Sequence, residues 1–227
     1  MKELSQKFSS SLRLPLQILA VMWIVHALQA LVGFDFGYLG IYPREVIGLR
    51  GVFLSPFIHG DWQHLFSNSV PLGAMMFTIL FFYRKVAYRA ILATTLLTGL
   101  AVWLFARPVF HIGASGVVYG LVSFVFWSGI FRRNIKSIVL ALIVVFLYSG
   151  LFWGILPNQE GISWESHLLG GVVGILVAWW YKSEIESDEG RYVPSWEREP
   201  QEGEQFFLER DIFEQTKAER QRRELDL

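Results

Sequence analysis

The chain has 227 residues, of which 53% are hydrophobic and only 18% are charged, with a formal net charge of zero. An ordinary soluble domain is about 45–50% apolar and about 25% charged, so the composition argues against a soluble α/β enzyme, a repeat solenoid or a nucleic-acid-binding protein. The charge is also uneven, because residues 182–227 hold 22 of the 40 charged side chains. The absence of cysteine excludes disulfides, thiolate metal sites and a cysteine nucleophile. Together these features indicate a membrane protein with a polar C-terminal tail.

The first 13 residues are polar and are expected to form a cytoplasmic N-terminus before a first span that is retained and not cleaved as a signal peptide. A spanning helix needs about 20 predominantly apolar residues. Six stretches approximately meet this requirement: 14–33, 65–83, 88–106, 115–131, 136–156 and 165–181. We therefore expect an all-α membrane protein in which residues 14–181 form a bundle of six transmembrane helices.

Basic residues gather after the second and fourth stretches and at the end of the sixth: Arg84, Lys85, Arg89, Arg132, Arg133, Lys136 and Lys182. Because cytoplasmic loops carry the excess of Lys and Arg, this distribution places both termini in the cytoplasm. The first loop, about 30 residues at 34–63, is rich in aromatic and branched side chains, so we expect it to be membrane-associated or packed on the bundle. The charged tail, 182–227, is expected to be solvated, with a short helix compatible with residues 204–226.

Polar side chains inside apolar spans are costly, so they mark candidate functional sites. Three polar clusters lie toward one end of their spans. His64 and Asn68 begin the second span, Gly113-Ala-Ser-Gly begins the fourth, and His167 lies in the sixth. His64 and Asn68 are four residues apart and therefore share one helix face. We expect the three clusters to meet at one depth in the bundle.

Small residues accompany these clusters where two helices can approach closely. The candidate packing residues are Gly113, Gly116, Gly120, Gly170 and Gly174. Ser115 and Tyr119 share one face of their helix. Gly170 and Gly174 share the helix face that carries His167. Close contact between these helices brings the Ser115 hydroxyl near the His167 ring, which is the arrangement of an activated serine.

Ser115 in Gly-Ala-Ser-Gly, His167 with its glycines, the His64–Asn68 pair and six spans in this order resemble the rhomboid family of intramembrane serine proteases. The resemblance covers roughly residues 15–181. It implies that Ser115 is the nucleophile and His167 the general base, in a dyad without an acidic third member. It also implies an oxyanion hole formed by the side chains of His64 and Asn68 with the backbone N–H of Ser115. Tyr119 is expected to stack on the His167 ring and orient it.

This resemblance implies a serine endopeptidase that cleaves transmembrane segments of other membrane proteins near the outer face. Its expected substrates are single-pass membrane proteins whose spanning helix is weakened near its outer end. No metal, cofactor or nucleic-acid partner is implied, and the expected location is a bacterial inner membrane with both termini cytoplasmic. The oligomeric state, the physiological substrate and the role of the tail are left undetermined by the sequence.

Two other functions stay open from the residues alone: a catalytically inactive rhomboid-like scaffold that binds transmembrane helices, and a small transporter. The presence of both Ser115 and His167 disfavours the scaffold, and the lack of internal repeats disfavours the transporter. A zinc site is also disfavoured, because the histidines do not form an H-E-x-x-H pattern. His59, just before the second span, is expected to be a structural hydrogen-bonding residue.

Overall fold

The computed structural model describes residues 2–133, 135–148, 154–156 and 163–184, with residues 216, 219 and 222; the side chains of 135–137 and 145 are outside this description. The chain divides into two units, Met1–Gly190 and Arg191–Leu227. The expected helix over 204–226 therefore lies outside the described residues except at those three positions. In the described part of the first unit the chain is helical, with a single isolated β-bridge, which confirms the all-α class.

The α-helices are α1 (Lys2–Val32), α2 (Gly51–Leu54), α3 (Trp62–Phe82), α4 (Ala87–Phe105), α5 (Ser115–Arg132), α6 (Ile135–Tyr148) and α7 (Trp164–Trp180). Short 3-10 turns in the first loop are η1 (Phe36–Leu39), η2 (Val46–Arg50) and η3 (Ser55–Phe57). Among the described residues, four helices, α1, α3, α4 and α5, are long and apolar enough to cross a membrane. In the fifth and sixth expected spans the described helices are α6 and α7, with 14 and 17 residues; residues 149–153 of the fifth expected span lie outside the described residues.

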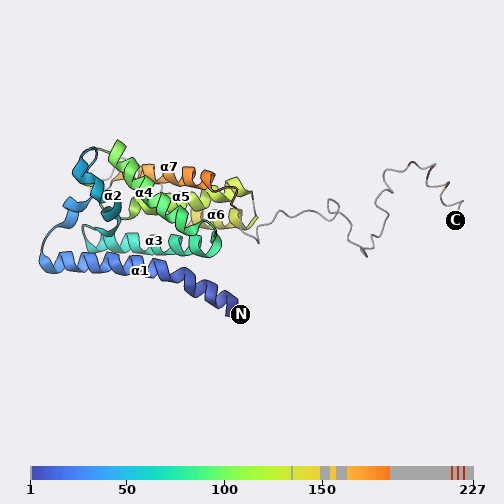
Figure 1. Ribbon diagram of the computed structural model, residues 1–227, viewed down its shortest axis with the longest axis horizontal. Helices are drawn as coiled ribbons and strands as arrows, with labels where there is room; N and C mark the ends of the chain where they lie inside the picture. The colour runs from blue at the N-terminus through green and yellow to red at the C-terminus, as the bar shows by residue number, and fades with distance from the viewer. Residues whose placement is uncertain are drawn as a thin grey trace. The chain divides into compact units, whose positions relative to one another are not determined.

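The helix that begins at Ser115 lies in the middle of the bundle. Helix α5 packs against α3, α4, α6 and α7, whereas α1 packs chiefly on α3 (Figure 1). Its side chains Leu121, Phe124 and Val125 are completely buried. Because α5 has neighbours on all sides, its first residue is held by the packing of several helices.

Helices α5 and α7 approach backbone to backbone through their glycines. A Cβ added to Gly170 would lie 2.0 Å from the carbonyl oxygen of Gly116, and one added to Gly174 would lie 2.2 Å from that of Gly120. Real Cβ atoms do not approach a backbone oxygen so closely, so both α7 positions require glycine. This is the close contact that small-xxx-small pairs permit in membrane helices.

We therefore predict that Gly170→Ala destabilises the protein, while Gly171→Ala does not. An alanine at 170 forces α5 and α7 apart, and overpacking of this kind costs about 1–3 kcal/mol. An alanine at 171 meets no atom within 4 Å. Thermal unfolding in detergent measures both variants, and equal transition temperatures would contradict the packing assigned to Gly170.

The first loop packs on the bundle at α4. Val52 of α2 is 3% exposed, and a Cβ added to Gly99 of α4 would lie 2.9 Å from its Cγ1. Arg50 holds the loop together, because its Nη2 donates to the Tyr38 carbonyl at 2.7 Å and its guanidinium lies 5.3 Å from the Tyr38 ring centroid. The loop thus forms a folded element with its own internal contacts.

Candidate active site

Ser115 and His167, from α5 and α7, meet as the sequence predicts. The His167 Nε2 and the Ser115 Oγ are 2.8 Å apart. Ser115 is the first residue of α5, and His167 is the fourth residue of α7 and is 7% exposed. The glycine contacts between the two helices bring their backbones close enough for the pair to meet.

A backbone carbonyl determines which nitrogen of the His167 ring carries the proton. Nδ1 lies 2.8 Å from the carbonyl oxygen of Gly154. A carbonyl oxygen only accepts hydrogen bonds, so Nδ1 must be the donor. In the neutral ring Nε2 is then unprotonated and accepts the hydrogen bond from the Ser115 hydroxyl. This is the tautomer that a general base needs.

Tyr119 and Gly154 enclose the remaining sides of the His167 ring. The Tyr119 and His167 rings are stacked, with centroids 4.1 Å apart and an interplanar angle of 7°. A Cβ added to Gly154 would lie 2.1 Å from the Tyr119 Oη and 3.0 Å from the His167 Nδ1. The sequence did not indicate Gly154, because a backbone acceptor has no residue-type signature; its only trace is a glycine inside an apolar stretch.

His64 and Asn68 lie on α3, which begins where Asp61 accepts a hydrogen bond from the His64 N–H at 2.7 Å. The Asn68 side chain is buried, and its Nδ2 donates to the His64 carbonyl at 2.8 Å. A Cβ added to Gly113 would lie 2.7 Å from the His64 Nε2, so the ring rests on the loop two residues before Ser115. Gly113 therefore does not serve helix packing as expected: it lies before α5, with a φ of +95° that favours glycine.

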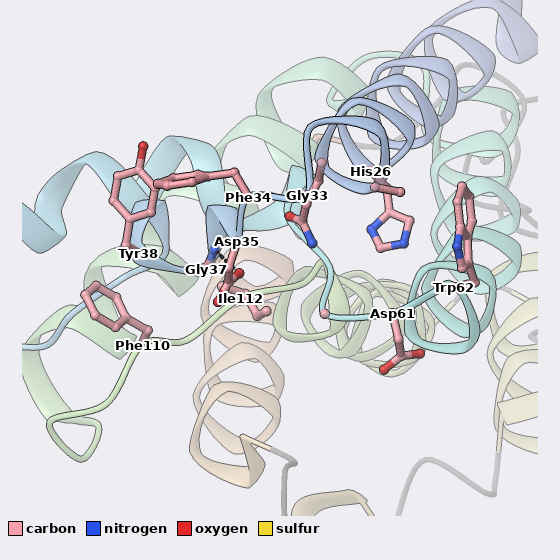
Figure 2. A pocket seen from close by; sticks show the side chains of 13 residues that line it. His26, Gly33, Phe34, Asp35, Gly37, Tyr38, Asp61, Trp62, Phe110 and Ile112 are labelled. Atoms are coloured by element: carbon pink, nitrogen blue, oxygen red, sulfur yellow. Dashed lines mark hydrogen bonds between the residues drawn. The ribbon is translucent and has the colours of Figure 1, made fainter.

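A cavity of about 790 Å³ opens beside this region, between the end of α1, the first loop and the start of α3. Tyr38 and Phe110 lie on one side of it, and His26 and Trp62 on the other (Figure 2). Neither Ser115 nor His167 is among the residues that line it. Within the described residues, no three His, Asp or Glu side chains gather in a way that could hold a metal ion.

His59 contributes to the structure through its backbone more than through its ring. Its carbonyl oxygen accepts hydrogen bonds from His26 Nδ1 at 3.2 Å and from Gln29 Nε2 at 3.1 Å, which connects α1 to the segment before α3. Neither ring nitrogen has a hydrogen-bond partner among the described residues. Burial, with the nearby His64 and His26, lowers the pKa of His59 to about 4.

The lowered pKa of His59 predicts a loss of stability in acid. The unfolded chain takes up a proton near the ordinary histidine pKa of 6.5, whereas the folded chain does so only near 4. The unfolded state thus binds more protons in this interval, and the free energy of unfolding falls as the pH drops from 6.5 toward 4, by roughly 3 kcal/mol in all. Thermal unfolding of His59→Gln should show a weaker pH dependence. The part due to His111, whose pKa burial also lowers, should remain. An unchanged dependence would contradict the assignment.

Comparison with known proteins agrees with this arrangement. Residues 48–184 match the Rhomboid domain, from the first loop to just beyond α7. Uncharacterized proteins of Mycobacterium tuberculosis and Mycobacterium bovis are 35% identical to the chain over 175 residues, 72% of each chain. An uncharacterized protein of Mycobacterium leprae is 28% identical over 173 residues, which are 72% of this chain and 68% of the relative. With the Ser115–His167 pair between two glycine-packed helices, these matches confirm the resemblance, and the chain belongs to the rhomboid family.

Proposed function

We propose that the protein is an intramembrane serine endopeptidase in which Ser115 and His167 act as a catalytic dyad. The observation that supports this proposal best is the 2.8 Å contact between Ser115 Oγ and His167 Nε2. The contact has catalytic meaning because Nδ1 donates to the Gly154 carbonyl and leaves Nε2 free to accept a proton. Serine hydroxyls are weak nucleophiles until an adjacent base activates them.

The geometry supports a two-step acyl transfer. Nε2 takes the Ser115 proton as the Oγ attacks the peptide carbonyl, and the resulting imidazolium then gives that proton to the leaving amine. A water molecule next attacks the acyl-enzyme, with His167 again as base. The imidazolium then returns the proton to the leaving Ser115 Oγ, and the new carboxyl end is released. Tyr119 stabilises the ring orientation throughout, since its stacked position restricts rotation of the imidazole.

The tetrahedral oxyanion needs hydrogen-bond donors that are in place before the reaction. We assign this role to the Ser115 backbone N–H with the side chains of His64 and Asn68. The first N–H of a helix has no acceptor within the helix, and the helix N-terminus favours negative charge. The Asn68 amide carries two N–H groups, of which one donates to the His64 carbonyl and the second is the proposed donor to the oxyanion.

In the proposed topology α6 and α7 also cross the membrane, which gives six spans with both termini in the cytoplasm of a bacterial cell. The basic residues between α3 and α4 and after α5 support this orientation. It puts Ser115, at the start of α5, near the outer face. Substrates are then single-pass membrane proteins whose helix unwinds near that face, because a helical peptide bond is shielded from Ser115.

Cleavage of a designed substrate in proteoliposomes tests the proposal. The substrate has one spanning helix with glycine and other small residues near its outer end, and a matched substrate has leucine at those positions. We expect a single cut near the outer end of the first substrate and at least tenfold slower cleavage of the second. No cleavage of either substrate by folded protein, or cleavage in the soluble flank alone, would contradict the proposal.

A further inference from the structure

His111 is a buried histidine that the proposed mechanism does not use. It lies in the loop between α4 and α5, four residues before Ser115, and is 3% exposed. Its backbone pairs with the first loop, since the Ile41 N–H donates to its carbonyl at 2.9 Å and its own N–H donates to the Ile41 carbonyl at 2.8 Å. The residue is therefore fixed in place, and its ring has a defined direction.

Both nitrogens of the His111 ring are bonded. Nε2 lies 3.0 Å from the Arg107 carbonyl oxygen, which only accepts, so Nε2 carries the hydrogen. Burial lowers the pKa of His111 below 6.5, and the ring is neutral at pH 7. Nδ1 is then an acceptor, and the Ser163 hydroxyl donates to it across 2.5 Å. The two histidines in this region thus hold opposite tautomers, Nε2–H in His111 and Nδ1–H in His167.

Ser163 is the N-cap residue of α7, directly before Trp164. Its Oγ accepts from the Ser166 N–H at 3.4 Å and lies 2.6 Å from the Ser166 hydroxyl, while its carbonyl accepts from the His167 N–H at 3.3 Å. Ser163 precedes His167 by four residues, as His111 precedes Ser115 by four. The His111–Ser163 bond therefore links the two chain segments that lead into the dyad, four residues before each member.

A second contact links the same segments but is weaker. The Arg107 Nε and Glu165 Oε1 are 3.3 Å apart, and the arginine side chain is 49% exposed while the glutamate side chain is 11% exposed. Ion pairs with this much exposure to solvent contribute little, since water and salt screen them. The His111–Ser163 hydrogen bond is partly buried, and of these two side-chain contacts it is the one better able to hold the segments together beside the glycine contacts of α5 and α7.

On the basis of the proposed function, we propose that His111, through Ser163, is a positioning residue for the Ser115–His167 dyad. It touches neither the substrate nor the reacting atoms. It holds the start of α7 against the loop that precedes Ser115, and so maintains the distance between the nucleophile and its base. Displacement of a reacting group by about 1 Å can cost a hundredfold in rate, so removal of this bond should lower kcat without weakening substrate binding.

A double-mutant cycle in the proteoliposome assay tests this inference with His111→Leu, Ser163→Ala and the double variant. We expect each single change to lower kcat about tenfold to a hundredfold, with KM unchanged. The double variant should be no slower than the slower single variant, because both changes remove the same bond. Ser123→Ala is the matched control. It also removes a hydrogen bond to α7, from Ser123 Oγ to the Gly171 carbonyl at 2.7 Å, but away from the dyad, and its kcat should be unchanged.

The histidine tautomers give a readout that does not depend on activity. In ¹⁵N spectra of histidine-labelled wild-type protein at pH 7.5, His111 should be the Nε2–H tautomer, and Ser163→Ala should change its signal. If His111→Leu does not fold, Ser163→Ala alone still tests the bond, because this variant removes the Ser163 hydroxyl and leaves His111 in the chain. Wild-type protein that cuts no substrate contradicts the proposed function itself. Active wild type with unchanged kcat in both single variants, multiplicative losses in the double variant, or an Nδ1–H tautomer at His111 would overturn the positioning role.

Discussion

Replacement of Ser115 or His167 by alanine is expected to abolish proteolysis. Ser115→Ala removes the nucleophile, and His167→Ala removes the base whose Nε2 lies 2.8 Å from it. In a soluble triad, loss of the serine or histidine lowers kcat on the order of 10⁶-fold, and a fall of that order here takes cleavage below detection. Each variant is assayed with the designed spanning substrate in proteoliposomes, after thermal unfolding shows that it is folded.

Two comparisons make this prediction specific. Ser123→Ala, on the same helix as Ser115, should keep wild-type activity, since Ser123 donates to the Gly171 carbonyl and does not touch His167. The Ser115→Ala/His167→Ala double variant should be no worse than either single variant, because the two residues act as one unit. Substantial cleavage by Ser115→Ala would mean that another group is the nucleophile.

The second large effect is expected for Gly154→Ala. The added Cβ would lie 2.1 Å from the Tyr119 Oη and 3.0 Å from the His167 Nδ1, so one of these groups or the turn itself must move. Movement weakens the bond that keeps the proton on Nδ1 and shifts the base relative to Ser115. We expect kcat to fall by about a hundredfold or more, with a mixture of His167 tautomers in ¹⁵N spectra.

Gly171→Ala is the control for this change, because an added Cβ at 171 meets nothing within 4 Å although the residue lies one helical turn after His167. It should keep both the wild-type kcat and the single His167 tautomer. If Gly154→Ala matches Gly171→Ala in rate and tautomer, the Gly154 carbonyl does not hold the base, and the orientation of His167 must depend on Tyr119 alone.

The sequence predicts the elements whose signal is local. Runs of apolar residues indicate α3, α4, α5 and α7 to within a few residues. This is because a spanning helix requires about the same number of apolar residues wherever it occurs in a chain. The start of α1 is different. The helix begins at Lys2 and not near residue 14. Hydropathy identifies only the apolar part of a helix, so it does not detect the polar helical turns that precede this part in α1.

In the candidate site too, some residues can be predicted from the sequence and others cannot. Ser115 and His167 are predictable, because the spacing of the surrounding glycines indicates which helix faces meet. The Gly154 carbonyl is not predictable, because a backbone acceptor has no residue-type pattern in the sequence. The His111–Ser163 bond is not predictable either, because it joins two side chains that are 52 positions apart in the chain. The helix-packing role expected for Gly113 is wrong for a related reason. In a sequence, a glycine required for its positive φ cannot be distinguished from a glycine required for close helix packing.

Labelling of detergent-solubilised protein with a fluorophosphonate probe tests the central claim most directly, because the probe reacts only with an activated serine. Wild-type protein should be labelled on Ser115, and Ser115→Ala and His167→Ala should both remain unlabelled. That result would establish the activated serine and exclude an inactive scaffold or a transporter. Folded wild-type protein with an intact thermal transition and no labelling, or labelling that persists in His167→Ala at the wild-type rate, would contradict the Ser115–His167 dyad.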